Sequence, residues 1–140
     1  MKKLNFRRRQ IMKLIRGKNL SYIPASHEDS KNPQVLKKVL LTYKDLVKGN
    51  VQMINWAKLP KGKKFLAHYH EDMQEIFIIM SGKIKVIIDE EERIMEKGDA
   101  VVVPFKSIHT MENVSSENAE YLVVGISTGK NGKTVQANYE

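Results

Sequence analysis

The chain has 140 residues, 41% of them hydrophobic, and a formal net charge of +8. This length suits one domain with a single hydrophobic core, and no window approaches the roughly 20 apolar residues that a membrane-spanning helix needs. The sequence contains no cysteine, which excludes disulfides, thiolate metal sites and a cysteine nucleophile and fits the cytoplasmic location that we expect.

The positive charge is concentrated at the N-terminus. Residues 1–20 carry eight Lys or Arg and no acid, whereas the remaining 120 residues hold sixteen basic and sixteen acidic side chains. We favour a solvated terminus. The alternatives are a transit peptide, a translation start at Met12, and a basic arm that touches nucleic acid or an acidic partner. The segment lacks the apolar stretch of a secretion signal, so secretion is not expected.

Residues 17–34 form the next segment and are dense in Ser, Asn, Asp and Pro. Such residues favour turns and local side-chain hydrogen bonds over regular ladders. We therefore predict an irregular basic N-terminal arm and linker over residues 1–34 and one β-barrel domain over residues 35–140.

From residue 35 onward the sequence changes to short runs rich in Val, Ile, Phe and Tyr, separated by turn residues. The predicted strands occupy residues 35–41, 51–58, 65–70, 74–80, 83–89, 93–96, 100–104, 108–113 and 120–126. Turns are expected at residues 81–82, 89–92 and 97–99. Many short strands without a long amphipathic helix after residue 20 predict an all-β sandwich or barrel.

Candidate metal ligands lie within residues 62–82. His68 and His70 point to the same face of a strand because side chains alternate, and Glu75 opens the next strand after a short polar corner. Two imidazoles and a carboxylate suit a divalent first-row metal, and a cation would offset the cost of burying Glu75 among apolar neighbours. His109, in another strand-rich stretch, is a fourth candidate.

Two motifs in this region resemble those of the cupin family. The first, G-x5-H-x-H-x4-E-x6-G, is matched at Gly62, His68, His70, Glu75 and Gly82. The second, G-x5-P-x-G-x2-H-x3-N, is matched at Gly98, Pro104, His109 and Asn113, with Lys106 in place of its internal glycine. That glycine serves the turn before the histidine, so the substitution leaves the conformation of this loop open.

The resemblance implies a double-stranded β-helix, or jelly roll, with a metal ion in its lumen. It implies that His68, His70, Glu75 and His109 bind one divalent transition metal ion, which is iron, manganese, nickel or zinc, and leave one or two coordination positions open. It also implies a homodimer that takes a small-molecule ligand or substrate. We do not expect nucleic acid or a membrane to be a partner.

Three functions are compatible with these features. The first is a metal-dependent enzyme of the dioxygenase or sugar-isomerase type, although no general acid or base outside the ligands stands out in the sequence. The second is a non-catalytic module in which the metal anchors a sugar or carboxylate. The third is a regulatory protein that uses its basic arm.

Side-chain alternation also nominates neighbours for the four candidate ligands. The side chains on the same faces as the ligands are Lys64, Leu66, Phe77, Ile79, Met111 and Asn113. We expect most of them to form the barrel core and Lys64 to lie in solvent near the rim. Trp56 is expected to pack, although alternation alone does not decide which face of its strand is inside.

Overall fold

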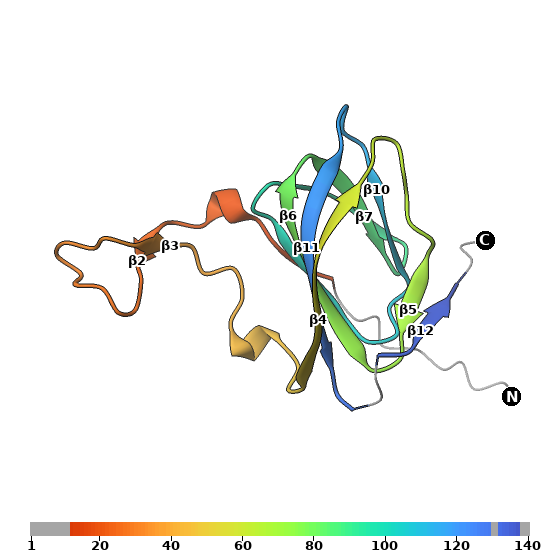
Figure 1. Cartoon of the computed structure of the whole chain (residues 1–140), viewed down its shortest axis with the longest axis horizontal. Coiled ribbons are helices and arrows are strands. Elements are labelled where there is room, and N and C mark those ends of the chain that lie inside the picture. Colours follow the sequence, from red (N-terminus) through yellow and green to blue (C-terminus); the bar gives the residue numbers. More distant parts are fainter. Residues whose placement is uncertain (1–11, 130–131, 138–140) are drawn as a thin grey trace, which may run out of the picture.

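The computed structural model describes residues 12–129 and 132–137, in which two five-stranded antiparallel sheets enclose one core (Figure 1). The first sheet has the order β1 (Lys13–Ile15), β9 (Ala100–Val103), β6 (Met73–Ser81), β11 (Ala119–Ser127) and β4 (Asn50–Leu59). The second has the order β12 (Thr134–Gln136), β5 (His68–His70), β10 (His109–Asn113), β7 (Lys83–Ile88) and β8 (Glu91–Glu96). This arrangement confirms the predicted all-β jelly roll.

The remaining elements belong to the N-terminal arm. They are the short ladder of β2 (Ile23–Pro24) and β3 (Leu36–Lys37) and the 3₁₀ turns η1 (Gly17–Asn19) and η2 (Tyr43–Asp45). None of the helical turns in the described ranges has the length and apolar character that crossing a lipid bilayer requires.

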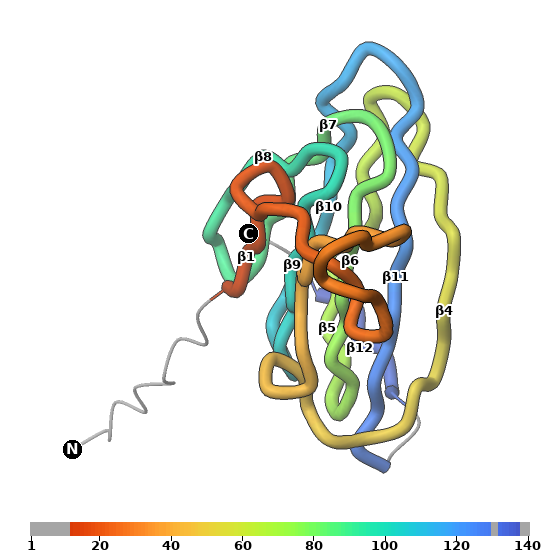
Figure 2. The backbone as a smooth tube through the Cα atoms, turned by 90° about the vertical axis from the view of Figure 1, so that its left-hand side faces the viewer, coloured from red at the N-terminus to blue at the C-terminus, as the bar shows by residue number. Residues whose placement is uncertain are grey.

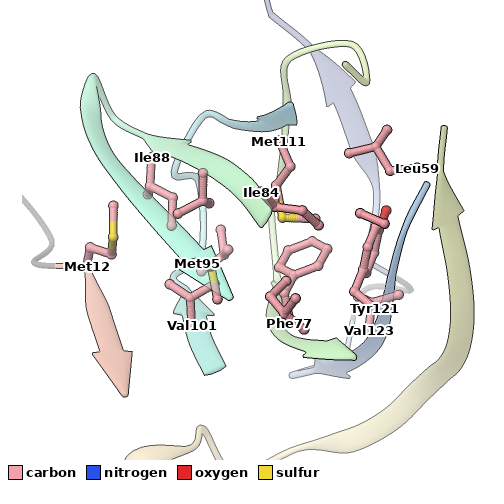
Figure 3. Packing of buried hydrophobic residues seen from close by; sticks show 14 residues of the cluster. Met12, Leu59, Phe77, Ile84, Ile88, Met95, Val101, Met111, Tyr121 and Val123 are labelled. Carbon is pink, nitrogen blue, oxygen red and sulfur yellow. The ribbon is translucent and has the colours of Figure 1, made fainter. Parts of the chain in front are cut away.

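The hydrophobic core lies between the two sheets, as Figure 3 shows. Phe77 and Val123 reach it from the first sheet, and Val86 and Met111 reach it from the second. Along β7 the buried side chains alternate with more exposed ones, which is the pattern of a strand with one face inside. Each fully buried side chain of this kind contributes roughly 1.5–3 kcal/mol, so this core holds the two sheets together.

The predicted hairpin turns are present. Gly82 and Gly98 have φ angles of +82° and +87°, which a residue with a side chain rarely adopts. The turn between β7 and β8 instead uses Asp89 and Glu90 at φ angles of 46° and 72°. The Oδ1 atom of Asp89 accepts a hydrogen bond from the backbone N–H of Ile108 at 3.0 Å, which ties this turn to the chain just before β10.

The predicted strand at residues 35–41 is wrong, because only Leu36–Lys37 pairs, and with β2 rather than with the barrel. The apolar side chains that follow are buried in another way. Leu41, Leu46 and Val47 pack against a cluster on the first sheet, formed by Ile76, Val102 and Ile126. Figures 1 and 2 show the arm on this outer side of the first sheet. Packing on a sheet face therefore satisfies these residues without a ladder.

The arm is also less irregular than predicted, because Lys13–Ile15 forms an edge strand on β9. Asp99, which is fully buried, holds the next residues: its Oδ2 lies 2.7 Å from Nη1 of Arg16, and its Oδ1 accepts a hydrogen bond from the N–H of Gly17 at 3.2 Å. These contacts join part of the arm to the barrel, while the division at residue 34 stays a prediction. Residues 1–11, which hold most of the basic tail, lie outside the described residues.

Candidate metal centre

The structure brings together the four side chains that the sequence nominated as ligands. His68 and His70 lie on β5, His109 on β10 and Glu75 on β6, and one donor atom from each lies within 4.8 Å of all the others. Direct pairing of His109 with His68 in the antiparallel ladder puts their ring centroids 4.5 Å apart. The convergence thus follows from strand register, with the first sheet supplying the carboxylate.

Three of these side chains are buried, and one is partly exposed. His109, Glu75 and His70 are 0%, 4% and 6% exposed, whereas His68 is half-buried. A carboxylate at such depth is costly unless hydrogen bonds or a cation compensate its charge. The partners of Glu75 therefore decide what the site can hold.

The outer nitrogens of two imidazoles are fixed by backbone carbonyls. Nδ1 of His68 lies 2.7 Å from the carbonyl oxygen of Leu66, and Nδ1 of His109 lies 2.9 Å from that of Ser107. Because a carbonyl only accepts hydrogen bonds, both Nδ1 atoms carry a proton. A neutral ring in this tautomer presents its lone pair at Nε2, on the inner side, as a metal ligand does.

The inner nitrogens converge on one carboxylate oxygen. Oε1 of Glu75 lies 2.5 Å from Nε2 of His70 and 3.0 Å from Nε2 of His109. In its neutral form His109 would point a lone pair at this oxygen, so two acceptors would face each other. A proton shared by the two atoms, or a metal ion bound by both, removes the conflict, and the donor set of three imidazoles and a carboxylate fits a divalent transition metal.

The electrostatics of the site keep its carboxylate charged. Burial raises the pKa of Glu75, but hydrogen bonds and charge interactions with His109 and His70 outweigh burial and bring this pKa down to about 2. Burial is also the main reason why the pKa of His68 lies below its ordinary value of 6.5. A charged Glu75 and a neutral His68 are the protonation states that metal binding requires.

His70 is supported by a strand that the sequence did not reveal. Its Nδ1 lies 3.1 Å from the hydroxyl oxygen of Thr134, on β12, which pairs with β5 along its whole length. This strand has only three residues and lacks an apolar pattern, so no local signal in the sequence predicted it. With the Thr134 hydroxyl, the Nδ1 atom of each of the three imidazoles has a hydrogen-bonding partner.

The walls beside the imidazoles are aromatic. The ring of Phe65 lies 5.4 Å from that of His68 and 6.1 Å from that of His109, and the ring of Phe77 lies 6.0 Å from that of His109. Phe77 was predicted from its alternation with Glu75, whereas Phe65 was not predicted. The regular strand begins only at residue 68, so alternation cannot be extended back to Phe65.

Because the strand begins only at residue 68, one of the two predicted neighbours of the ligands before it is wrong. Leu66 is 72% exposed and does not face the lumen, and Lys64 is exposed, as expected for the rim. The expected packing of Trp56 is wrong, because its side chain is 68% exposed. On β4, Met53 and Ala57 are the residues that pack against the core.

Tyr121 is an ionisable core residue that the sequence reasoning passed over. It lies on β11, and its ring centroid is 5.5 Å from that of Phe77. Burial, with a smaller effect from the charge of Glu75, raises the pKa of Tyr121 above its ordinary value of 10.0. Its alternation with Val123 in the predicted strand at residues 120–126 was the available signal.

The loop of the second motif keeps a left-handed residue although its glycine is missing. Lys106 has a φ angle of 58°, and its N–H donates a hydrogen bond of 2.8 Å to the carbonyl oxygen of His70. Asn113, from the same motif, has a structural role: its Nδ2 donates to the carbonyl oxygens of Leu59 and Glu117 at 2.9 and 2.7 Å. The second motif thus connects the corner at His70 to the end of β10.

Comparisons with known proteins agree with this geometry. An uncharacterised protein of Methanocaldococcus jannaschii is 30% identical over 87 residues, which are 62% of this chain and 68% of that protein. A solved sugar phosphate isomerase from a cupin superfamily, from Silicibacter pomeroyi, is 31% identical with a TM-score of 0.50, covering 54% of this chain and 50% of that one. A solved cupin protein from Bacteroides fragilis is 24% identical with a TM-score of 0.51, covering 55% and 66%.

The match therefore spans less than two thirds of the length of each of these two solved structures. The family model of the cupin domain matches residues 55–125, which include both motifs and all four clustered side chains. The chain belongs to the cupin family.

Proposed function

We propose that His68, His70, Glu75 and His109 bind one divalent transition metal ion, and that the protein is a metal-dependent enzyme acting on a small molecule. The observation that carries this proposal is the convergence on Oε1 of Glu75. Nδ1 of His109 donates to a carbonyl, so its Nε2 faces a carboxylate oxygen 3.0 Å away, and a cation bound by both atoms would remove the repulsion of their lone pairs. Iron, manganese, nickel and zinc all suit this donor set.

The residues around the centre have separable roles in this proposal. A bound metal would polarise an oxygen atom of the substrate or activate dioxygen. Phe65 and Phe77 would exclude water from one side of the centre. Tyr121 carries its proton at neutral pH, as a tyrosine ordinarily does, and its pKa is raised further, so its hydroxyl offers a hydrogen-bond donor inside the barrel.

The aromatic walls favour a dioxygenase-type reaction on a small, largely apolar substrate. Besides the ligands, the rings that lie against the imidazoles are those of Phe65 and Phe77, whereas a sugar phosphate would need several charged or polar contacts. The isomerase type is the second candidate, because a sugar phosphate isomerase from Silicibacter pomeroyi is 31% identical to this chain. A non-catalytic module, in which the metal only anchors a ligand, is the third.

The test is elemental analysis of the protein purified without a metal-affinity tag, followed by oxygen-consumption assays with small acids and phenols. Stoichiometric iron with substrate-dependent oxygen uptake would support the dioxygenase type. Zinc, manganese or nickel without oxygen uptake would favour isomerisation of sugar phosphates. A ligand that binds without turnover would favour the non-catalytic module. A folded, metal-free protein that fails to take up any of these ions would refute the proposal.

We also propose that two copies of the chain pair through β4. This strand is ten residues long, lies at the edge of the first sheet and leaves Val51, Ile54 and Trp56 59%, 67% and 68% exposed. Within the described ranges no strand pairs with the outer edge of β4, and an edge of this length favours strand addition, which an antiparallel pair related by twofold symmetry would provide. Sedimentation velocity should show a dimer that Ile54→Lys dissociates, and a native monomer would contradict this arrangement.

A further inference from the structure

A cavity lies outside the barrel, between the arm and the turn that connects β8 and β9. Its volume is about 500 Å³, and its lining includes residues of η1, of β3 and of that turn. Among the described residues of this lining, the charged ones are Lys18, Lys37, Lys38 and Lys97, and none is an acid. We call this cavity the lysine pocket. None of its residues belongs to the metal centre.

The charges of the lysine pocket are only weakly compensated. Lys18 makes a 3.4 Å ion pair with Glu96, in which both side chains are well exposed, and such pairs contribute little. Asp99 is a buried carboxylate two positions after Lys97 in the sequence, but it already pairs with Arg16. Lys97 makes no ion pair or side-chain hydrogen bond within the ranges that the structure describes. Four like charges around one cavity repel one another and raise the local concentration of anions.

Two of the ammonium groups have neutral partners, and that of Lys38 is held against residues of the lining itself. Nζ of Lys38 donates to the carbonyl oxygen of Gly17 at 2.8 Å and lies 4.9 Å from the ring centroid of Tyr22. Nζ of Lys37 donates to the hydroxyl of Ser26 at 2.8 Å. An ammonium group has three donors, so each retains donors for a ligand while its position is fixed. This preorganisation lowers the cost of binding an anion.

We propose that the lysine pocket binds a small phosphorylated molecule with at least two negative charges. Phosphate oxygens accept several charge-assisted hydrogen bonds, which suits lysines that approach from three segments. Tyr22 and Leu36, 65% and 52% exposed, offer apolar surface for an organic part. The volume lies in the range of small-molecule sites rather than extended grooves.

Single-stranded nucleic acid fits the pocket less well than a small phosphorylated molecule. Sequence-tolerant binding of single strands relies on aromatic faces on which bases stack. Tyr22 is the one aromatic residue of the described lining, and Lys38 lies over one face of its ring, so the pocket offers a single ring face for stacking. The basic residues before position 12 can attract polyanions in general, so the test must separate them from the pocket.

The experiment is calorimetric titration of the full chain with inorganic pyrophosphate at physiological salt. We expect one site, weakened about tenfold by Lys97→Gln and about a hundredfold by Lys37→Gln combined with Lys97→Gln. Lys61→Gln and Arg8→Gln remove the same charge elsewhere in the chain and should leave the affinity within about twofold. His109→Ala should also bind pyrophosphate normally, which separates this site from the metal centre.

Several outcomes would overturn the proposal. Equal losses in all four lysine and arginine variants would show attraction by net charge alone. Loss of binding in His109→Ala would place the pyrophosphate at the metal centre. Absence of binding to the native chain would exclude the site. Binding of a 12-nucleotide single strand that pyrophosphate does not displace, with no pyrophosphate site in the pocket, would assign the surface to nucleic acid.

Discussion

The metal centre and the lysine pocket gather charge in opposite ways. At the metal centre three imidazoles surround one buried carboxylate, and each imidazole has a hydrogen-bonding partner behind it. At the lysine pocket four ammonium groups surround open space, and the described lining holds no acid. The barrel can bury a charge because its strands deliver the partners in register, whereas the arm leaves its charges near solvent, where water compensates them.

The same contrast explains what each region could bind. A buried, preorganised set of ligand atoms suits a metal ion that stays with the protein. Removing the ion would leave a buried carboxylate and imidazole nitrogens without their partner. A rim of exposed ammonium groups suits a ligand that exchanges. The following four predictions test this contrast, beginning with the largest effect.

Removing one ligand should nearly abolish metal binding. We expect His109→Ala to lower metal affinity by more than about a hundredfold, because an incomplete donor set is left, and Thr134→Val to lower it by about tenfold, because only the support of His70 is lost. Equilibrium competition with a chelator measures both. Stoichiometric metal retained by His68→Ala as well as His109→Ala would disprove the assignment of the centre.

The acid sensitivity of the metal-free protein should depend on Glu75. Its folded-state pKa, about 2, lies below its ordinary value of 4.5, so its contribution to stability is complete above pH 4.5 and is lost as the pH falls towards 2. The difference corresponds to about 3 kcal/mol of unfolding free energy. Urea denaturation between pH 7 and pH 2, with a chelator present, should show this loss, and Glu75→Gln should lack it. Identical pH profiles would contradict the pairing with the histidines.

The join between arm and barrel should be costly to break. Asp99→Asn removes the charge that Arg16 faces and weakens the acceptor for the N–H of Gly17, so we expect a loss of about 2–3 kcal/mol in unfolding free energy. Arg93→Ala breaks an exposed pair with Glu91 and should cost less than about 1 kcal/mol. Equal stabilities of Asp99→Asn and the native chain in denaturant titrations would mean that the arm unfolds separately from the barrel.

The smallest effect is expected at Lys106. Its φ angle of 58° is unfavourable for a residue with a side chain, so Lys106→Gly should stabilise the protein by about 0.5–1 kcal/mol after the entropic cost of glycine. Thermal unfolding would detect this as a rise in Tm. A lower Tm would mean that the lysine side chain compensates the backbone strain by its own contacts.

The barrel and most of its centre could be predicted because their signals are local. The alternation of Ile84, Val86 and Ile88 along one strand, and the spacing of His68, His70 and Glu75 around one corner, depend on neighbouring residues only. His109 could be nominated from its strand-rich context, and the second motif supported it, but its pairing with His68 could not be predicted, because strand register across the sheet cannot be read from composition.

The arm could not be predicted because its structure depends on distant partners. Arg16 pairs with Asp99, which lies 83 positions away, and Lys13–Ile15 becomes a strand only because β9 offers a free edge. Phe65 was missed for a related reason: the chain leaves regular strand geometry before His68, so counting alternate residues nominated Leu66 instead.

The position of β12 has a consequence for the order in which parts of the centre are synthesised. The four clustered side chains lie between positions 68 and 109, whereas the strand that flanks both histidines of β5, Thr134–Gln136, comes later in the chain. A nascent chain therefore exposes all four ligands before His70 can meet Thr134. Stable metal acquisition is then expected only once β12 has joined the second sheet.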